Sequence, residues 1–556
     1  MRNTKNGRAA QQRSIDNETN PKIISQIFSM QYKKILDRKQ KGIPDAKFRH
    51  LNINYRKYSY ESIRISSKIL LKAVASLKCS IGFDGIHSNH INKLCTNLYL
   101  LIVAMLFTCF LSHEYSPSEH LRGKISPTIK DKFGNLNSSS NYRPVMTSSV
   151  FLKLFEYCIL FKIKEFVKLN DRQHGFRESY STATACFSLK ETIFNYINSG
   201  SKVYASFLDL RKAFDSVNHE YLIDRLLDIG IPDLFISNIK YIYSNQLVKV
   251  RYDDFFSDEW LICNGVRQGG VLSGLLFNIY IDDVLNKITN LKIGCRLGIS
   301  ASNIIAYADD IVVLAPSPSS LQILINIIYT ELLKLDLIIN ENNSKIMIFT
   351  SGKSIHFNVR QFFIGSKSLD KVDSFTYLGY EIEYNLSFNR DINRRRSKFY
   401  SEFNQVLRKF NGTNTSVKLL LFKQYCLQLY GAELWFGNRN AKGNFKQFSV
   451  GYHKAVKKLI GVSYHESNHY ACQEAQILMF DHYVFSLKVN FLFRLYRHPC
   501  EFIRKNMHFL LISSVFFNEV NAFASVKYSI DSIFDNDEDA IFARICYIQN
   551  HETPLR

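Results

Sequence analysis

Three aspartates stand where the surrounding sequence is apolar and a charge is costly. Asp309 and Asp310 lie inside the β-branched apolar run 304–315, and Asp209 directly follows the apolar run 203–208. Buried carboxylates are destabilising unless they bind a cation or lie at an exposed turn. A solvated turn is the commoner explanation for an isolated Asp-Asp pair, so the pair alone does not decide between the two.

Both apolar runs predict buried β-strands, because they are short and rich in residues that favour strands. If the two strands are neighbours in one sheet, the three carboxylates meet at the strand ends. Clustered carboxylates repel one another unless divalent cations neutralise them. Two ions about 3.5–4 Å apart suit in-line phosphoryl transfer, and hard oxygen ligands favour Mg²⁺. The residues therefore indicate a magnesium-dependent phosphoryl-transfer site.

The composition favours a nucleic-acid partner. The chain has 556 residues, of which 46% are hydrophobic, and 71 Lys+Arg against 49 Asp+Glu give a net charge of +22. This length predicts several domains, and the hydrophobic content excludes general disorder. A strongly basic chain favours a polyanionic partner, most often nucleic acid. A basic enzyme without such a partner is the alternative.

The cysteines and the apolar runs indicate an intracellular protein. The 11 cysteines are scattered with no Cys-x-x-Cys pair, which argues against a zinc ribbon and a disulfide framework. The first 20 residues contain no apolar signal segment. The longest apolar run, 98–111, is shorter than the ~20 residues of a bilayer span and predicts a buried core helix. We expect no membrane partner and a location in the nucleus and cytoplasm.

Seven motifs in chain order resemble a reverse transcriptase of the non-LTR (LINE-like) retrotransposon class. They are GFDGI (82–86), TIKDKFGNLNSSSNYRPV (128–145), QHGFR (173–177), FLDLRKAFDSV (207–217), GVRQGGVLSGLLFNIYIDD (265–283), YADD (307–310) and YLGYEI (377–382). The resemblance implies an α+β right-hand polymerase fold with fingers, a palm with an antiparallel sheet, and a helical thumb. Helical N- and C-terminal extensions would complete the chain.

The resemblance also implies roles for the acidic residues. Asp209 and Asp309 would bind both of two Mg²⁺ ions, and Asp310 would complete the acidic triad. Lys345 matches a lysine that could protonate the leaving pyrophosphate, although a solvated lysine on a strand edge is the alternative. Gly274 stands where many relatives have proline, which removes no catalytic group.

Further residues match positions that contact the incoming nucleotide. Lys130 and Arg143 would clamp the triphosphate of a dNTP, since Arg can bind phosphate through two hydrogen bonds. Phe214 fits a steric gate against a ribose 2′-hydroxyl, with a plain core residue as the alternative. Gln268 and Gly269 would form the turn beneath the nucleotide, where glycine permits close backbone approach.

The contacts with nucleic acid are expected in the part of the chain that follows the YADD motif. The YLGYEI motif resembles a primer grip, and the arginine run that follows it is expected on a thumb helix that tracks the duplex through its phosphates. A solvated charge run is the alternative for the arginines. The predicted residues are Tyr377, Leu378, Gly379, Arg394, Arg395 and Arg396.

These features divide the chain into five predicted regions. They are a basic mobile arm (1–45), an N-terminal helical extension (46–115), fingers and palm (116–385), a thumb-like helical region (386–470) and a C-terminal helical accessory region (471–556). Residues 1–50 carry 12 Lys/Arg against 4 Asp/Glu, which motivates the basic arm.

The predicted function is RNA-directed DNA polymerisation, in which dNTPs extend a DNA primer on an RNA template. One alternative is an RNA-dependent RNA polymerase, and another is a decayed or truncated element protein that only binds nucleic acid. The sequence shows no zinc knuckle and no upstream endonuclease region. We therefore expect a separate endonuclease activity to cut the target.

Overall fold

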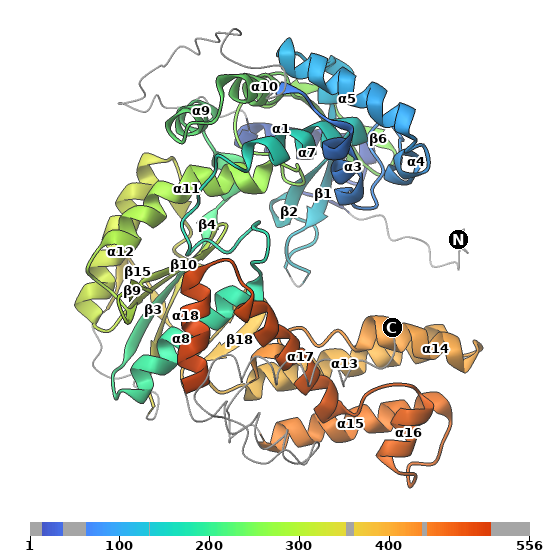
Figure 1. The fold of residues 1–556 in the computed structure, drawn as a ribbon, viewed down its shortest axis with the longest axis vertical. Helices are drawn as coiled ribbons and strands as arrows, with labels where there is room; N and C mark the ends of the chain where they lie inside the picture. The colour runs from blue at the N-terminus through green and yellow to red at the C-terminus, as the bar shows by residue number, and fades with distance from the viewer. Residues whose placement is uncertain (1–13, 37–62, 133, 352–360, 436–441, 513–556) are drawn as a thin grey trace. The chain divides into compact units, whose positions relative to one another are not determined.

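The computed structural model describes residues 14–36, 63–132, 134–351, 361–435 and 442–512 (Figure 1). The chain divides into two compact units. Unit 1 comprises residues 1–170, 210–286 and 329–339, and unit 2 comprises residues 171–209, 287–328 and 340–556. Each unit contains a β-sheet and a hydrophobic cluster of its own.

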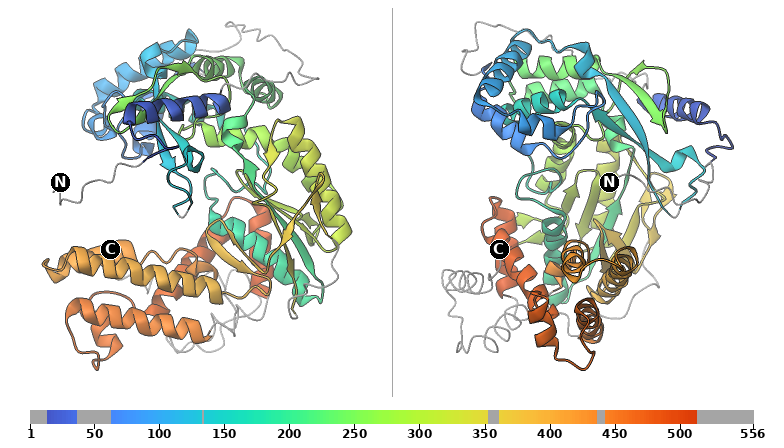
Figure 2. Two further views of the ribbon diagram at one scale, coloured as in Figure 1. Left: turned by 180° about the vertical axis from the view of Figure 1, so that it is seen from behind. Right: turned by 90° about the vertical axis from the view of Figure 1, so that its right-hand side faces the viewer.

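The sheet of unit 1 is built on β1 (Gly123–Ile129), which pairs antiparallel with β2 (Tyr142–Ser148) and parallel with β5 (Leu247–Tyr252). The short strands β6 (Phe255–Phe256) and β7 (Trp260–Leu261) both pair with β5. Figure 2 shows the cyan hairpin of β1 and β2 from behind and from the side. Strands β1 and β2 carry the predicted fingers hairpin, so that prediction is confirmed as a local structure.

Helix α1 (Pro21–Leu36) packs against this sheet. Phe28 and Tyr32 are fully buried and belong to one cluster with Ile125 and Val248. The mobile arm predicted for residues 1–45 is therefore wrong over residues 14–36. The polar residues before Pro21 concealed an amphipathic helix whose apolar face completes the sheet's core.

The remaining helices of unit 1 include one that is less buried than the sequence predicts. They are α3 (Ser67–Ser76), α4 (Ser88–Lys93), α5 (Asn97–Ser112), α6 (Ser118–Leu121), α7 (Val150–Ile163), α9 (His219–Asp228) and α10 (Asp233–Ser244). Helix α5 buries Val103 and Phe107 but leaves Leu98, Ile102 and Met105 more than half exposed. The predicted buried core helix is therefore confirmed for one face of α5 and wrong for the other.

The sheet of unit 2 has the strand order β10-β11-β3-β13-β16. The strands are β3 (Val203–Leu208), β10 (Ile304–Tyr307), β11 (Asp310–Ala315), β13 (Lys345–Phe349) and β16 (Asp370–Lys371). The first four pair antiparallel, and among these five described strands β16 alone pairs parallel with its neighbour. The predicted antiparallel palm sheet is confirmed.

Helix α8 (Thr182–Asn198) packs on this sheet and lies beside α18 (Glu501–Ile512), as Figure 1 shows. Helix α17 (Phe480–Tyr496) joins the same core, in which Phe187 of α8 contacts Phe491 at 5.7 Å between ring centroids. The C-terminal region predicted as an accessory domain therefore contributes α17 and α18 to the palm core.

The other helices of unit 2 form a second aromatic cluster. They are α13 (Asn389–Lys409), α14 (Thr415–Leu421), α15 (Lys442–Ile460) and α16 (Asn468–Glu474). Phe399, Phe422 and Tyr452 are buried at its centre. Two further helices, α11 (Ser273–Asn290) and α12 (Pro318–Lys334), include residues of both units.

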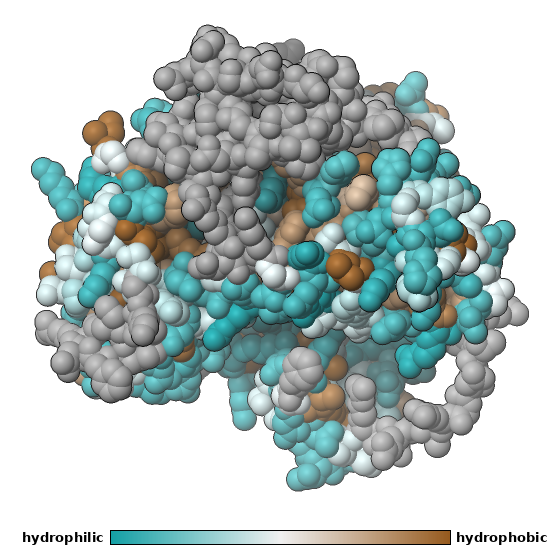
Figure 3. Space-filling model, turned by 90° about the horizontal axis from the view of Figure 1, so that it is seen from below, coloured by the Kyte–Doolittle hydropathy of each residue, from teal (hydrophilic) through white to brown (hydrophobic). Residues whose placement is uncertain are grey.

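The surface is consistent with the composition. Hydrophilic residues dominate the described surface seen in Figure 3, and hydrophobic residues are scattered among them. Within the described ranges, no helix is long and apolar enough to cross a bilayer.

Candidate active site

The YADD motif forms the hairpin between β10 and β11. Tyr307 pairs with Asp310, so Ala308 and Asp309 make a two-residue turn. Ala308 has a φ of 54° and is buried. This left-handed conformation costs an L-residue about 1–2 kcal/mol, so the surrounding structure must hold it. The predicted hairpin with acidic residues at its tip is confirmed.

Asp209 directly follows β3, the neighbour of β11. In this antiparallel pair Leu208 lies opposite Ile311, so the same register continued by one residue sets Asp209 opposite Asp310. The strands that carry the predicted acidic residues are therefore neighbours in one sheet, and the three residues lie at one end of it.

The polar residues just before β13 form hydrogen bonds with Asp209. The Oδ2 atom of Asp209 accepts hydrogen bonds from Asn340 Nδ2 at 2.9 Å and from Asn343 Nδ2 at 2.8 Å. Ser344 Oγ also accepts a hydrogen bond from the Asp209 backbone N–H at 3.2 Å. Sequence reasoning missed these three residues, although the polar stretch NENNS between two apolar runs was a signal that could have revealed them.

The chemistry of these side chains fits a hard divalent cation, because Mg²⁺ prefers carboxylate oxygens. In the part of the chain that the structure describes, however, no three His, Cys, Asp or Glu side chains are arranged closely enough to hold a metal ion. The binding of two Mg²⁺ ions by Asp209, Asp309 and Asp310 thus stays a prediction.

Lys345 begins β13 and forms an ion pair. Its Nζ donates to Asp370 Oδ2 at 2.7 Å and to the Asn342 carbonyl at 2.9 Å. The hydrogen bond and charge of Lys345 lower the pKa of Asp370. A proton donor to pyrophosphate would have to leave this exposed pair, so the catalytic role of Lys345 also stays a prediction.

In unit 1, the glycine-rich turn contacts two neighbouring segments. The Gln268 carbonyl accepts from Met146 N of β2 at 2.9 Å, and Gln268 Nε2 donates to Asp215 Oδ1 at 2.8 Å. Gly269 has a φ of 109°, and a Cβ there would lie 2.9 Å from the Met146 carbonyl oxygen. Only glycine satisfies both the conformation and the close approach.

A buried ion pair supports the same turn and was not predicted. Arg267 donates a hydrogen bond to Glu156 of α7, and both side chains are almost completely buried. Burial raises the pKa of Glu156, and the Arg267 guanidinium opposes this shift. Because one charge without the other would be strongly destabilising, the pair fixes the turn to α7.

The predicted gate residue Phe214 is half-buried in η3 (Ala213–Ser216), and its ring stacks on Phe277 with 4.7 Å between centroids. Its carbonyl accepts a hydrogen bond from Val266 N at 2.7 Å. Unit 1 therefore brings Phe214 close to the glycine-rich turn.

Lys130 and Arg143 have exposed side chains on the fingers hairpin. The Lys130 backbone N–H donates to the Asn141 carbonyl at 2.7 Å, and Arg143 lies opposite Thr128. Arg143 lies on β2, the same strand as Met146, whose N–H donates a hydrogen bond to the Gln268 carbonyl of the glycine-rich turn.

The predicted primer grip is a second two-residue hairpin in unit 2. Strands β17 (Ser374–Tyr377) and β18 (Tyr380–Glu383) flank Leu378 and Gly379, whose φ values are 47° and 81°. Two positive φ angles are typical of the type I′ turn that matches the twist of a hairpin. The Leu378 carbonyl accepts a hydrogen bond from Tyr430 at 2.8 Å, so the turn is tied to the helical region.

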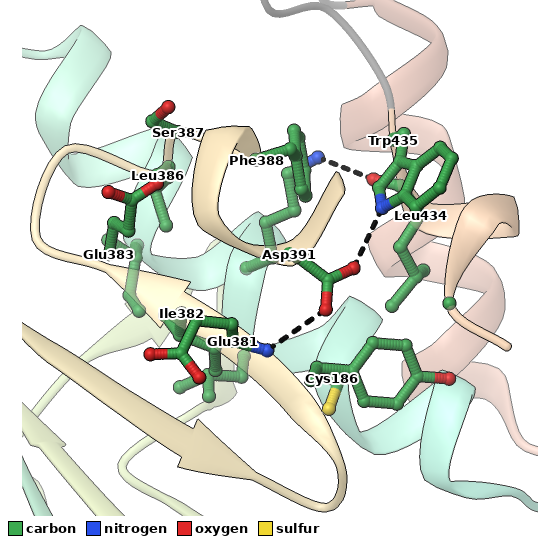
Figure 4. A pocket seen from close by; sticks show the side chains of 15 residues that line it. Cys186, Glu381, Ile382, Glu383, Leu386, Ser387, Phe388, Asp391, Leu434 and Trp435 are labelled. Carbon is green, nitrogen blue, oxygen red and sulfur yellow. Dashed lines mark hydrogen bonds between the residues drawn. The ribbon is translucent and has the colours of Figure 1, made fainter. Parts of the chain in front are cut away.

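Arg395 is buried and contacts the turn of this hairpin. It donates a hydrogen bond to the Gly379 carbonyl and forms an ion pair with Asp391 at 3.6 Å. Asp391 accepts a hydrogen bond from Trp435 Nε1 at 2.8 Å in a mostly apolar pocket (Figure 4). The predicted phosphate contact of Arg395 is therefore wrong. Of the three arginines, only Arg394 and Arg396 keep solvent-accessible side chains.

Residues 130–382 match the family described as "Reverse transcriptase (RNA-dependent DNA polymerase)". This part of the chain resembles a reverse transcriptase domain. The predicted resemblance is therefore confirmed. The matched residues include β2, β5, the sheet of unit 2 and the YADD hairpin, whereas β1 precedes them.

The curated relatives come from retrotransposable elements. The Pol polyprotein from the type-2 retrotransposable element R2DM of Drosophila melanogaster is 26% identical over 326 residues, 57% of this chain and 30% of the relative. The probable RNA-directed DNA polymerase from transposon BS of the same species is 23% identical over 413 residues, 71% of this chain and 44% of the relative. The chain thus spans less than half the length of these relatives.

A further likeness is to a solved structure of apo telomerase from Candida tropicalis. The TM-score is 0.39 and the sequence identity 12%, covering 82% of this chain and 74% of that chain.

Proposed function

We propose that this protein is an RNA-directed DNA polymerase of a non-LTR retrotransposon, which extends a DNA 3′-hydroxyl on an RNA template. The observation that carries the proposal is the strand register that sets Asp209 opposite Asp310, beside the YADD turn, within the residues that resemble a reverse transcriptase domain. Three carboxylates at one end of a sheet are the ligand set that nucleotidyl transfer by two metal ions requires.

In this proposal Asp209, Asp309 and Asp310 hold two Mg²⁺ ions. The chemistry that the ions supply is activation of the primer hydroxyl and neutralisation of the leaving pyrophosphate. Asn340 and Asn343 orient the Asp209 carboxylate through their two hydrogen bonds to Oδ2. Lys345, once released from Asp370, donates a proton to pyrophosphate.

In this proposal the dNTP is bound by residues of unit 1. Lys130 and Arg143 bind the triphosphate through charge-assisted hydrogen bonds. The Phe214 ring, set by its stacking on Phe277, excludes a ribose 2′-hydroxyl and so selects dNTPs. The turn at Gln268 and Gly269 supports the nucleotide.

The nucleic acids are held mainly through their phosphates. The hairpin of Tyr377, Leu378 and Gly379 positions the primer, while Arg394, Arg396 and the net charge of +22 attract the duplex backbone. A separate endonuclease activity would supply the nicked DNA end that serves as primer.

The first test replaces the acidic residues. Asp309→Asn should lower primer extension on an RNA template on the order of 10³-fold, because metal and charge placement carry most of the rate enhancement. Binding of the RNA–DNA duplex should survive. Asp254→Asn is a matched control, since this carboxylate is 94% exposed on unit 1. Retention of a tenth of the wild-type rate in Asp309→Asn would refute the assignment.

The second test addresses sugar selection and separates the alternatives. Phe214→Ala should raise the kcat/KM for rNTPs relative to that for dNTPs, with a modest loss of the dNTP rate. An unchanged ratio would mean that Phe214 is only a packing residue. A wild-type protein that incorporates rNTPs in preference would instead be an RNA polymerase, and one that binds duplex without extension would be a binding protein.

A further inference from the structure

The QHGFR motif lies along the edge of the palm sheet and extends its hydrogen-bond ladder. Gln173 forms a parallel bridge with Ala306 of the edge strand β10. The Ala306 N–H donates to the Arg172 carbonyl at 2.9 Å, and the His174 N–H donates to the Ala306 carbonyl at 2.7 Å. The segment thus acts as a short additional strand that ends beside the YADD turn.

The next donor along this ladder is the Ala308 N–H, inside the turn. A regular parallel ladder would pair it with the carbonyl of residue 174, because parallel bonds alternate at two-residue steps. Here the side chain of Gln173, and not the carbonyl of residue 174, is the acceptor for the Ala308 N–H. Its Oε1 accepts from Ala308 N at 2.8 Å, and the same oxygen accepts from Gly175 N at 2.9 Å.

The chemistry of these contacts fixes the orientation of the amide. Both partners are backbone N–H donors, so the Gln173 oxygen must face them. The side chain is completely buried, and Nε2 has no hydrogen-bond partner among the described residues. Burying an unpaired amide group is unfavourable, and the two hydrogen bonds that the Gln173 oxygen accepts offset this cost.

Gly175 permits the close approach of this segment to the turn. A Cβ at residue 175 would lie 2.5 Å from Ala308 N and 3.1 Å from the Tyr307 carbonyl carbon, both of them backbone atoms that cannot move aside cheaply. The segment therefore contacts the backbone of the two residues that directly precede Asp309.

We propose that Gln173 is a positioning residue for the catalytic hairpin. Its Oε1 fixes the strained Ala308 peptide and thereby sets the place of the next residue, Asp309. The consequence for catalysis rests on the proposed polymerase function, whereas the consequence for the turn does not.

Three substitutions of Gln173 separate the effect of its acceptor oxygen from the effect of its side-chain length. Gln173→Met keeps the length but removes the acceptor, and Gln173→Asn keeps the amide but shortens its reach. Gln173→Glu keeps an acceptor oxygen in either ionisation state and is the expected rescue. Thr192→Val is the matched control, because it removes a buried hydrogen bond to Ser302 elsewhere in unit 2.

The first measurement is hydrogen–deuterium exchange of the full chain, followed by mass spectrometry of peptides that span the YADD turn. In Gln173→Met and Gln173→Asn one further amide should exchange roughly five- to tenfold faster. Gln173→Glu and Thr192→Val should match the wild type. This arm does not depend on activity, so it stands even if the wild type does not extend a primer.

The second measurement is steady-state primer extension. Gln173→Met and Gln173→Asn should lower kcat about 10- to 100-fold, as is typical when support for metal ligands is lost, and leave the KM for dNTP unchanged. Gln173→Glu should recover most of kcat. The proposal is overturned if both deficient variants keep wild-type turn exchange, or if Thr192→Val lowers kcat equally. If Gln173→Met does not fold, Gln173→Asn decides alone.

Discussion

The YADD hairpin and the predicted primer-grip hairpin of unit 2 have the same design but opposite kinds of support. In each, a tyrosine begins a two-residue turn whose backbone takes positive φ, at Ala308 in the YADD hairpin and at Leu378 and Gly379 in the primer-grip hairpin. The YADD turn is held through an N–H group, which donates to Gln173. The primer-grip turn is held through carbonyl groups, which accept from Tyr430 and Arg395.

The difference follows from the charge each hairpin presents. A cationic donor beside Asp309 would compete with a metal ion for the carboxylates, whereas a neutral amide fixes the backbone and adds no positive charge. The primer-grip turn contains no acidic residue, so a buried arginine can support it. Support of the two turns by groups of opposite polarity thus agrees with the ligands predicted for them.

The largest expected effect tests the charged support. Arg395→Met should destabilise unit 2 by about 3–5 kcal/mol, because it leaves the buried Asp391 carboxylate without its cation. Arg394→Met, on an exposed neighbour, should change stability by no more than about 0.5 kcal/mol. Thermal and denaturant unfolding of both variants provide the measurement. Equal effects would mean that burial of Arg395 does not distinguish it from the surface arginines.

The second prediction concerns His498, which lies between the C-terminal helices α17 and α18 and packs against Tyr180. His498 is buried, its ring lies 4.5 Å from that of Tyr180, and burial lowers its pKa to about 4. The unfolded chain therefore takes up a proton near the ordinary pKa of 6.5 that the folded chain refuses, so stability is present above pH 6.5 and lost as the pH falls.

Between pH 7 and pH 5 this linkage should cost about 2 kcal/mol. His498→Asn keeps an acceptor for the Cys500 N–H, which His498 Nδ1 accepts at 3.1 Å, but does not titrate. Its melting temperature should therefore depend less on pH than that of the wild type over this interval. Parallel melting curves against pH would show that another group is responsible for any acid instability.

How far the sequence predicts each hairpin depends on whether its support is local. The acidic tip of the YADD hairpin and the glycine of the primer-grip turn are visible in the sequence, because charge and glycine restrict what the chain can do. The left-handed Ala308 is not visible, since its support comes from Gln173, 135 residues away. Arg395 reads as one of three surface arginines, and only the packing of α13 shows that it is buried.

The same reasoning explains the errors at the chain's ends. Helix α1 follows a polar segment, so its burial depends on a sheet formed more than 80 residues later, at β1. The helices α17 and α18 contain no motif of the family, but their apolar residues complete the palm core. Periodicity predicts that such helices exist but does not identify the surface that they cover.

The smallest expected effects compare the backbone strain of the two turns. Ala308→Gly would remove about 1–2 kcal/mol of left-handed strain. It would also lose a buried methyl group worth about 0.8 kcal/mol and raise the entropy of the unfolded chain by about 0.4–1 kcal/mol. These terms nearly cancel, so the stability of Ala308→Gly should lie within about 1 kcal/mol of the wild type.

Gly379→Ala acts on the other hairpin with the opposite sign. Its φ of 81° penalises a side chain, and the new Cβ would lie 3.2 Å from Tyr430 Cε1, the residue that holds the turn. A loss of about 1 kcal/mol is expected after the gain in unfolded-state entropy is subtracted. Denaturant unfolding of both variants decides the comparison. If Gly379→Ala were neutral while Ala308→Gly stabilised unit 2 by more than about 1 kcal/mol, the strain would reside in the YADD turn alone, where the hydrogen bond from Ala308 N to Gln173 helps to maintain it.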